Sequence, residues 1–392
     1  MLYHLEGYDM RSWESYQAVY VHVPFCVQKC LYCDFTSYAS CSLDLQERYV
    51  QALVREIEER GSRLSLPIHS GASVFFGGGT PSLLPVGLLE KLVAAMKGYG
   101  FWREPAEATL EANPGTVDLE KLKRLRELGF DRISFGVQSL NAGELRSIGR
   151  IHDPKQALEA LEWAQKAGFA RINADLMYGL PGQTLASYES TVKQMVSLGL
   201  KHISAYSLIL EENTPLEQLV LQGKLQLPEE DMVADMYEFT NDYLPSKGLL
   251  RYEISNYAVP GQESRHNQQY WRYHPYAALG VAACEFTGKE RFTHTASVQE
   301  YLQNWQKGME RENLSQEELL EEYMFMGLRQ TRGVDLAEAE ERFGVRITDK
   351  FASAINKFAG QGMLVLNEEK QLLKPTAKGM ALGNQLFEAF ML

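Results

Sequence analysis

Basic residues are in deficit in this chain of 392 residues, and the deficit limits what the protein can bind. Lysine and arginine number 39, against 51 aspartates and glutamates, so the formal net charge is −12. A protein that covers nucleic acid or an anionic membrane needs clustered positive charge. We therefore expect no nucleic-acid partner.

Long apolar runs are also missing. No stretch approaches the roughly 20 apolar residues that a membrane-spanning helix needs, and the one long run of small apolar residues is AALGVAAC at 277–284. The first residues, MLYHLEGYDMRSWESY, carry acids where a secretory leader has a basic stretch followed by an apolar one. We expect a cytoplasmic protein.

Cysteine is scarce, and its few copies are unevenly placed. Of the five cysteines, Cys26, Cys30 and Cys33 fall within VYVHVPFCVQKCLYCDFTS (19–37), whereas Cys41 and Cys284 lie apart. An odd number with three clustered does not suit a disulfide framework in a reducing compartment. Free cysteines are mostly inert packing residues, so Cys41 and Cys284 receive no role, but the cluster requires a chemical explanation.

Short β-rich runs alternate with helical runs over the first 250 residues. The predicted strands are rich in Val, Ile, Phe and Tyr, as buried parallel strands are. The segments between them repeat apolar residues at helical spacing. This alternation predicts a parallel sheet with right-handed crossovers, and six units are two short of a full barrel. The fold class is therefore α/β, a partial (βα)₆ TIM-like barrel, with strands at 18–25, 72–77, 107–113, 132–138, 171–180 and 202–210.

The alternation of predicted strands and helices ends at about residue 250. Residues 251–314 are an aromatic-rich and turn-rich connecting segment, and residues 315–392 are predicted as four helices with a hairpin at 364–376. Helices with a two-stranded wing predict a C-terminal α+β, winged-helix-like domain. Acidic residues at 338–341 and 368–369 favour a packing cap over a DNA reader. The predicted domains are 1–250, 251–314 and 315–392.

Thiolates ligate soft metals, so zinc and iron–sulfur clusters are the candidates for Cys26, Cys30 and Cys33. Structural zinc takes four ligands, commonly in two C-x₂-C pairs. The pattern C-x₃-C-x₂-C has no second pair, and Cys41, His22 and Cys284 lack the spacing to complete one. A four-iron cluster on three thiolates leaves one iron open for a small molecule, which favours iron–sulfur.

Five motifs together resemble the HemN/HemW branch of the radical S-adenosylmethionine (SAM) proteins. They are VHVPFCxxxCxYC, FGGGTPS, FGVQS, GRIH and DLMYGLPGQT, and the resemblance runs from about Tyr20 to the C-terminus. It implies a radical SAM barrel with added C-terminal elements. It also implies a [4Fe–4S] cluster whose open iron is chelated by the amino and carboxylate groups of SAM.

Further residues match the SAM contacts of that branch. Tyr32 directly precedes Cys33, where the family places an aromatic against the adenine. The glycine-rich loop after the second strand exposes N–H groups to a ligand. Later strands end in polar residues, and in such barrels the strand ends build the site. The residues assigned to SAM are Tyr20, Tyr32, Gly78, Gly79, Thr80, Glu111, Gln138, Arg150, Asp175 and Ile209.

Two functions of different classes remain within this branch. A coproporphyrinogen III dehydrogenase decarboxylates two propionates of its tetrapyrrole, whereas a haem chaperone binds haem and delivers it. The dehydrogenases carry a fourth cysteine two residues after the third, where this chain has Phe35. They also carry a long N-terminal extension, and here the first cysteine already stands at position 26. Both features favour the chaperone, and the acidic charge disfavours a third hypothesis, a tRNA-modifying enzyme.

The stretch RHNQQYW (265–271) matches an HNxxYW motif of the chaperone branch. Its histidine, His266, is the leading candidate for an axial haem ligand, because neutral imidazole binds haem iron. A histidine that only anchors its loop is an equal alternative. His274 and Tyr270 are weaker candidate ligands, and Trp271 could pack on a porphyrin face or fill the core.

The partners follow from the resemblance rather than from the residues. It implies haem as cargo and respiratory apo-haemoproteins as recipients. It also implies peripheral docking at a membrane, and a homodimer.

Overall fold

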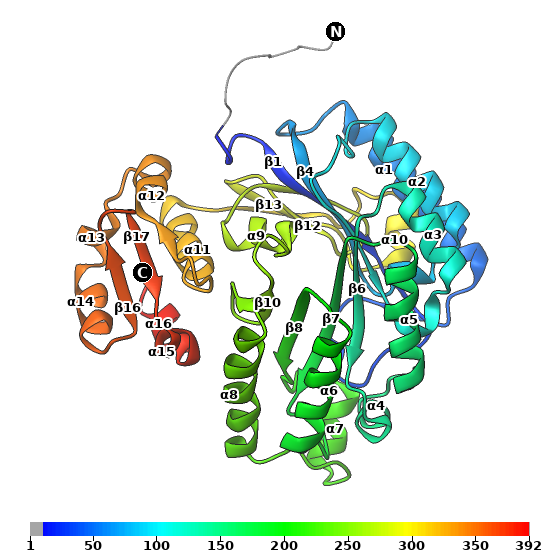
Figure 1. Ribbon diagram of the computed structural model, residues 1–392. Helices are drawn as coiled ribbons and strands as arrows, with labels where there is room; N and C mark the ends of the chain where they lie inside the picture. Colours follow the sequence, from blue (N-terminus) through cyan, green and yellow to red (C-terminus); the bar gives the residue numbers. More distant parts are fainter. Residues whose placement is uncertain (1–10, 392) are drawn as a thin grey trace.

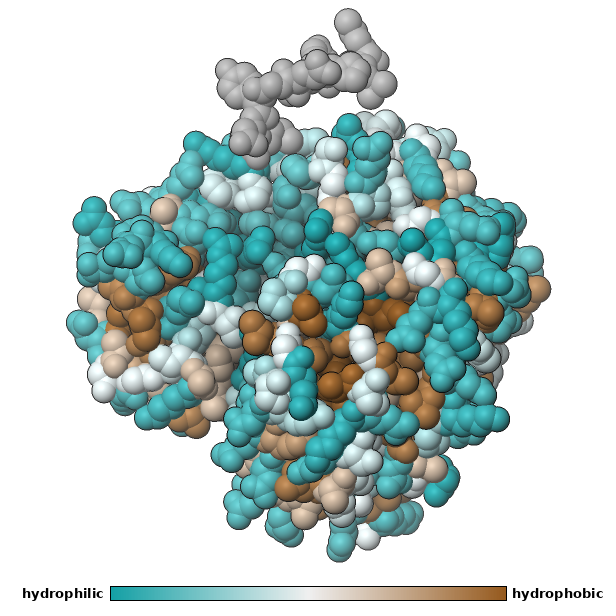
Figure 2. All heavy atoms as spheres, in the orientation of Figure 1, coloured by the Kyte–Doolittle hydropathy of each residue, from teal (hydrophilic) through white to brown (hydrophobic). Residues whose placement is uncertain are grey.

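The computed structural model describes residues 11–391 (Figure 1). Residues 1–10 and 392 lie outside that range, and with them most of the stretch on which the expectation about a leader rests. No helix between residues 11 and 391 combines the length and the apolar character that crossing a membrane requires. In the space-filling view, hydrophilic residues cover most of the visible face, and apolar residues gather near its centre (Figure 2).

The predicted partial barrel is confirmed. Six parallel strands follow one another in chain order across the sheet, and helices cover their outer face (Figure 1). The strands are β1 (Tyr16–Val23), β4 (Ile68–Gly78), β5 (Ala108–Ala112), β6 (Arg132–Gln138), β7 (Arg171–Tyr178) and β8 (His202–Ser207). The helices between and after them are α1 (Leu43–Gly61), α2 (Val86–Gly98), α3 (Leu119–Leu128), α4 (Ala142–Ser147), α5 (Pro154–Lys166), α6 (Leu185–Ser197), α7 (Pro215–Leu221) and α8 (Glu230–Ser246).

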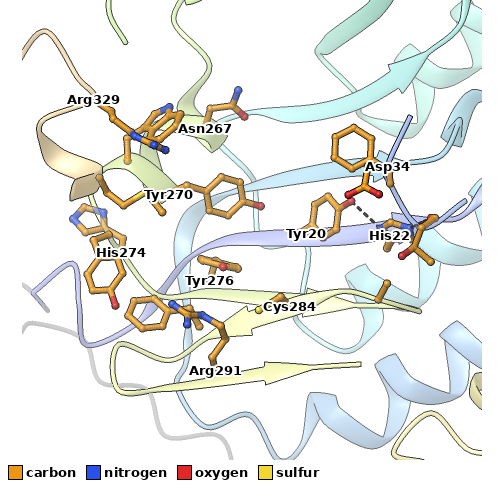
Figure 3. A pocket seen from close by; sticks show the side chains of 17 residues that line it. Tyr20, His22, Asp34, Asn267, Tyr270, His274, Tyr276, Cys284, Arg291 and Arg329 are labelled. Carbon is orange, nitrogen blue, oxygen red and sulfur yellow. Dashed lines mark hydrogen bonds between the residues drawn. The ribbon is translucent and has the colours of Figure 1, made fainter. Parts of the chain in front are cut away.

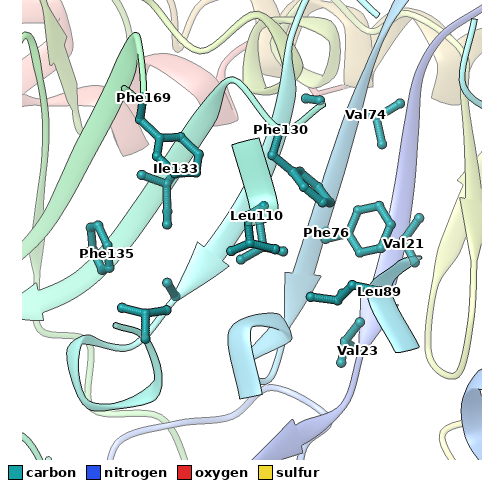
Figure 4. Packing of buried hydrophobic residues seen from close by; sticks show 14 of the residues in the cluster. Val21, Val23, Val74, Phe76, Leu89, Leu110, Phe130, Ile133, Phe135 and Phe169 are labelled. Atoms are coloured by element: carbon teal, nitrogen blue, oxygen red, sulfur yellow. The ribbon is translucent and has the colours of Figure 1, made fainter. Parts of the chain in front are cut away.

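The main core lies between the sheet and these helices. Val21 and Val23 of β1 pack beside Phe76 of β4 and Leu89 of α2, and all four are almost fully buried (Figure 4). Each such side chain contributes roughly 1.5–3 kcal/mol through burial. Side chains alternate along a strand, so Tyr20 and His22 of β1 face the other side, toward the barrel interior.

The sheet extends beyond the six predicted strands. Residues 251–314, expected only to connect two domains, supply strands at both edges: β10 pairs antiparallel with β8, and β11 pairs parallel with β1. The full order is β14-β13-β12-β11-β1-β4-β5-β6-β7-β8-β10-β9. The added elements are β9 (Leu250–Arg251), β10 (Asn256–Ala258), α9 (Arg265–Trp271), β11 (Tyr276–Leu279), β12 (Cys284–Phe286), β13 (Glu290–Thr293), α10 (Val298–Gln303) and β14 (Glu310–Asn313).

The C-terminal α+β domain lies beside the barrel and has its own apolar core (Figure 1). Its wing gains a third strand, because β15 pairs with β17 in the order β15-β17-β16. Two predicted helices are divided, 348–361 into α13 and α14 and 378–390 into α15 and α16. The elements are α11 (Gln316–Gly327), β15 (Val334–Asp335), α12 (Leu336–Phe343), α13 (Ile347–Lys350), α14 (Ala352–Gly360), β16 (Leu364–Asn367), β17 (Leu372–Pro375), α15 (Ala377–Ala381) and α16 (Gly383–Glu388).

A buried ionic network ties α1 to the added strands. Glu56 on α1 accepts hydrogen bonds from Tyr301 and from His294, whose Nε2 lies 2.9 Å from Oε1. Arg60 bridges Glu56 and Glu285 of β12. Burial opposes the charge of Glu56, but His294 and Arg60 outweigh it and lower the pKa to about 2. Burial also opposes the charge of His294, yet Glu56 raises its pKa above the ordinary value.

The substitution His294→Gln tests this network. It should reduce the free energy of unfolding by about 3 kcal/mol at mildly acidic pH, because Glu56 loses a buried partner. The raised pKa of His294 stabilises the fold below its unfolded value, and that gain disappears as the pH rises through the folded value. The difference from wild type in urea unfolding should therefore shrink with rising pH, whereas His69→Gln, at an exposed position, should show no such trend. An equal loss at every pH would contradict the ion pair.

Candidate functional site

The cysteine loop begins where β1 ends. The short strand β2 (Phe25–Cys26) pairs with β3 (Tyr38–Ala39) and closes the loop at its base. At its middle, the Leu31 amide donates to the Ile148 carbonyl at 3.0 Å. A Cβ on Gly149 would lie 2.8 Å from the Leu31 side chain, so glycine permits this close approach. The loop is thus held against the mouth of the barrel at both ends and at its centre.

All three thiols border one hollow of about 140 Å³. Thr80 Oγ1 lies 3.6 Å from Cys26 Sγ, and Arg150 Nη1 lies 3.4 Å from Cys30 Sγ. Burial raises the pKa of the Cys26 thiol, while the Thr80 hydroxyl acts in the opposite direction. In the described part of the chain, no three His, Cys, Asp or Glu side chains are placed to hold a single metal ion. Thiols set around a hollow instead suit a cluster in which each binds its own iron.

The glycine-rich loop forms the floor of the same hollow. Gly78 has a φ of 107°, and a Cβ there would lie 2.4 Å from the His22 ring. A Cβ on Gly79 would lie 2.8 Å from the backbone of Phe25. The Thr80 amide donates to the Phe25 carbonyl at 2.7 Å. Glycine is therefore required here for the loop to pack against the start of the cysteine loop.

Two part-buried carboxyl groups face the hollow without an ion-pair partner among the described residues. Glu111 accepts a hydrogen bond from the Gly78 amide at 3.2 Å. Asp175 accepts hydrogen bonds from Ser134 Oγ at 3.1 Å and from Asn173 Nδ2 at 2.8 Å. Burial, and after it the charge of Asp175, raises the pKa of Glu111 to about 8. Burial also raises the pKa of Asp175. Such acids are suited to receive a ligand's ammonium or hydroxyl groups.

Arg150 crosses the mouth of the barrel from the other side. Its guanidinium donates to Asn113 Oδ1, to the Gly136 carbonyl and to Cys30, while its buried Nε has no partner among residues 11–391. Gln138 nearby has a φ of 65°, a left-handed conformation that is rare outside glycine and concentrates at functional sites. The unpartnered donor and the strained backbone both mark this edge as built for a ligand.

A second hollow, of about 320 Å³, continues from the first across the barrel mouth. The two share Tyr32, Phe35, Glu111, Ser134, Gln138 and Asp175 in their walls. The second one reaches Tyr206 and Asn267 on the far side. Together they offer one connected space that starts at the three thiols and has both polar and apolar walls, which suits a nucleoside ligand on a cluster.

A larger cavity, of about 720 Å³, lies between the barrel and the C-terminal domain. We call it the aromatic cavity, because five tyrosine and tryptophan side chains line it together with a few polar residues (Figure 3). Phe35, 70% exposed, lies where this cavity meets the two smaller hollows and lines all three. The lining includes Tyr20, His22, Asp34, Phe35, Tyr270, Trp271, Tyr273, Tyr276, Cys284, Arg291, Met326 and Arg329.

Most of the predicted SAM residues come together, and two do not. Tyr32, Gly78, Gly79, Thr80, Glu111, Gln138, Arg150 and Asp175 all border the hollow of the three thiols. Tyr20 instead lines the aromatic cavity, where its hydroxyl lies 3.0 Å from His22 Nδ1. Ile209 is 67% exposed, because β8 ends at Ser207 and leaves this residue on the following loop. Ile209 does not line the hollow in this arrangement, and its contact with SAM stays a prediction.

The predicted haem ligand His266 is placed differently from the expectation. It is fully buried on α9, and its ring stacks on Phe75. Its Nδ1 lies 3.0 Å from Ser73 Oγ, and its Nε2 lies 2.8 Å from the Tyr270 hydroxyl. Both ring nitrogens are thus engaged, and in this arrangement neither is free for iron. Tyr270 and His274, the alternative ligands, do line the aromatic cavity, and so does Trp271.

Sequence reasoning missed several residues of these sites. Asn113, two positions after Glu111, donates to Thr80 Oγ1 at 2.8 Å and also binds Arg150. Its place at the same strand end was a usable signal. Nothing in the sequence indicated that Arg291 and Arg329 line the aromatic cavity, because their position there depends on the tertiary packing of distant segments.

Comparisons with known proteins identify the family of this chain. The radical SAM superfamily model matches residues 20–195, and the HemN C-terminal domain model matches residues 314–382. "Heme chaperone HemW" of Lactococcus lactis is 36% identical over 377 residues, which cover 96% of this chain and 97% of that protein. "Heme chaperone HemW" of Bacillus subtilis is 36% identical over 380 residues, which cover 96% and 99%. This chain belongs to the HemW family.

A solved structure supports the fold of this family member. Coproporphyrinogen III oxidase (HemN) from Escherichia coli superimposes with a TM-score of 0.80 at 23% identity, over 97% of this chain and 92% of that one. Membership of the radical SAM superfamily implies a [4Fe–4S] cluster and SAM. The donors around the first hollow fit both: three thiols for iron, with carboxyl groups and an arginine for a zwitterionic nucleoside.

The cluster assignment predicts a specific loss in Cys30→Ser. Because each thiol would bind a different iron, removing one should leave the reconstituted protein with less than half of the wild-type iron and sulfide. Cys41→Ser is the matched control, since Cys41 follows the same loop but does not line the hollow. Iron and sulfide should be assayed after anaerobic reconstitution, and a full complement in Cys30→Ser would refute the assignment.

The part-buried carboxyl at Glu111 predicts a loss of SAM affinity in Glu111→Gln. Loss of one charged hydrogen bond in a buried site should weaken binding by about 1.5–3 kcal/mol. Equilibrium dialysis with reconstituted protein measures this directly. Glu120→Gln, on the exposed side of α3, should bind SAM as wild type does, and equal affinities for all three proteins would return Glu111 to a purely structural role.

Proposed function

We propose that this protein is a haem chaperone, which binds haem in the aromatic cavity and delivers it to apo-haemoproteins. The observation that carries the proposal is the cavity itself, which is large and aromatic and lies next to the cluster hollow. Its volume of about 720 Å³ falls in the range of small-molecule sites. Flat aromatic side chains such as Tyr270 and Tyr276 offer stacking and edge contacts to a macrocycle. The names of the two curated relatives support the same function.

Phe35 favours delivery over the alternative, decarboxylation of coproporphyrinogen III. It occupies the position of the dehydrogenases' fourth cysteine, and its side chain stands between the cluster hollow and the aromatic cavity. An apolar ring there supplies no sulfur to the cluster hollow and adds apolar surface where the two spaces meet. Cluster and cargo would then be neighbours without direct reaction between them.

The identity of the side chain that faces the haem iron is part of the proposal. His266 stays a prediction, and to act as a ligand it would have to give up its hydrogen bond to Tyr270 or to Ser73. Tyr270 lines the cavity already, although its hydroxyl would have to give up the same hydrogen bond to His266. His274 lines it too, although its Nδ1 lies 2.8 Å from Gln269 Oε1. Tyrosine and histidine are both established axial ligands of haem.

The substitution Cys284→Trp tests the location of the cargo. The thiol lines the aromatic cavity and is part-buried, so an indole at this position would occupy the space of the macrocycle. We expect at least a tenfold loss of haem affinity in a Soret titration, with unchanged iron and sulfide content of the cluster. Leu250→Trp, half-exposed on β9 and outside the cavity, should bind haem as wild type does.

The second part of this test measures the transfer of haem to an apo-haemoprotein. Wild-type protein loaded with haem should lose it to an apo-haemoprotein, and Cys284→Trp should transfer little because it carries little. If the filled cavity binds haem as tightly as wild type, haem lies elsewhere and the proposed site is wrong.

A further inference from the structure

Arg329, just after α11 of the C-terminal domain, lines the aromatic cavity without an acidic partner. No hydrogen bond or ion pair of its guanidinium is present within residues 11–391, and its buried Nε has no partner. It lies instead against aromatic rings: its Cζ is 3.8 Å from the centre of the Phe325 ring and 5.2 Å from that of Phe387. Burial lowers the pKa of Arg329, and Glu253 only partly offsets this effect.

The other arginine of the cavity differs in this respect. Arg291 lies 2.9 Å from Glu312 and 2.5 Å from Glu322, so its charge is already neutralised. An arginine that is held by ring faces keeps its N–H edge free, because cation–π contact uses the flat face of the guanidinium. The free edge of Arg329 is therefore the strongest anion-binding feature of the cavity wall.

A second donor lies beside it. Trp271 on α9 also lines the cavity, and its buried Nε1 has no partner in the part of the chain that the structure describes. The Arg329 Cζ lies 6.0 Å from the centre of this indole ring, and Gln330 donates to the Trp271 carbonyl at 2.8 Å. Arg329 stands at one end of the cavity together with Asn267, away from Tyr20 and Asp34 at the other end (Figure 3). Buried donors without acceptors are costly, and a ligand's anion would satisfy both.

We propose that Arg329 and Trp271 form a carboxylate subsite that anchors a propionate of the cargo. This inference rests on the proposed function, since it assumes that haem occupies the aromatic cavity. A carboxylate would accept from the guanidinium edge and from the indole N–H, while the tyrosines contact the macrocycle. Because Trp271 belongs to α9 and Arg329 to the C-terminal domain, one propionate would bridge the two parts of the molecule. Porphyrins with free carboxylates would be selected over neutral ones.

The test compares haem with haem dimethyl ester, which has the same macrocycle without the charges. Full-length wild-type protein should bind haem at least about tenfold more tightly than the ester in the same detergent-containing buffer. In Arg329→Gln the affinity for haem should fall about tenfold, because a charge-assisted hydrogen bond is lost. Its affinity for the ester should stay within about twofold of wild type. Equal losses for both ligands, or no loss for either, would overturn the subsite.

Controls separate this inference from folding and from the proposed function. Arg332→Gln removes a nearby arginine that pairs with Asp335 outside the cavity, and it should bind both ligands as wild type does. Trp271→Phe keeps a ring but removes the N–H, so it should weaken haem binding several-fold and leave ester binding unchanged, even if Arg329→Gln folds poorly. If Cys284→Trp leaves haem binding intact, haem does not lie in the aromatic cavity. The proposed location is then wrong, and the subsite, which depends on it, is wrong as well. If Cys284→Trp abolishes binding but Arg329→Gln and Trp271→Phe keep the wild-type preference for haem over its dimethyl ester, only the subsite fails.

Discussion

The parallel pairing of β1 on both sides is the constraint on which the sites depend. β1 lies between β4 and β11, so it belongs at once to the barrel and to the strands added by residues 251–314. Its alternation buries Val19, Val21 and Val23 beneath the helices and turns Tyr20 and His22 toward the aromatic cavity. The cysteine loop begins directly after the last residue of β1. A shift of one residue in register would exchange these faces and disrupt both sites.

The cluster hollow and the aromatic cavity would bind their ligands through different interactions. Within residues 11–391, the cluster hollow gathers polar groups without a paired partner: Glu111 and Asp175 make no ion pair, and Arg150 Nε has no acceptor. Such groups destabilise the empty fold and favour a ligand that satisfies them. The aromatic cavity relies instead on apolar contact area, with unpartnered donors at one end. Phe35 lies where these two environments meet.

Much of this could be predicted from the sequence, for physical reasons that are local. Buried parallel strands appear as runs of β-branched and aromatic residues, so the six central strands were found within a few positions. Cys26, Cys30, Cys33 and Gly78 could be grouped at one site, because spacing and loop chemistry are visible in the chain, and all four border the same hollow. The short strands β9 to β14 have no comparable periodicity, since they gain their pairing from the sheet edges. The burial of His266 and the exposure of Ile209 depend on packing and on where β8 ends, and neither is visible in a motif.

The most direct measurement is made on anaerobically reconstituted protein supplied with SAM and a reductant. Coproporphyrinogen III and haem are offered in separate reactions, with the porphyrin product followed by mass and haem by its Soret band. The account predicts no decarboxylation and saturable haem binding that an apo-haemoprotein can draw down. Decarboxylated porphyrin over many turnovers would contradict it, and would show that the fourth cysteine, replaced here by Phe35, is dispensable for the dehydrogenase reaction.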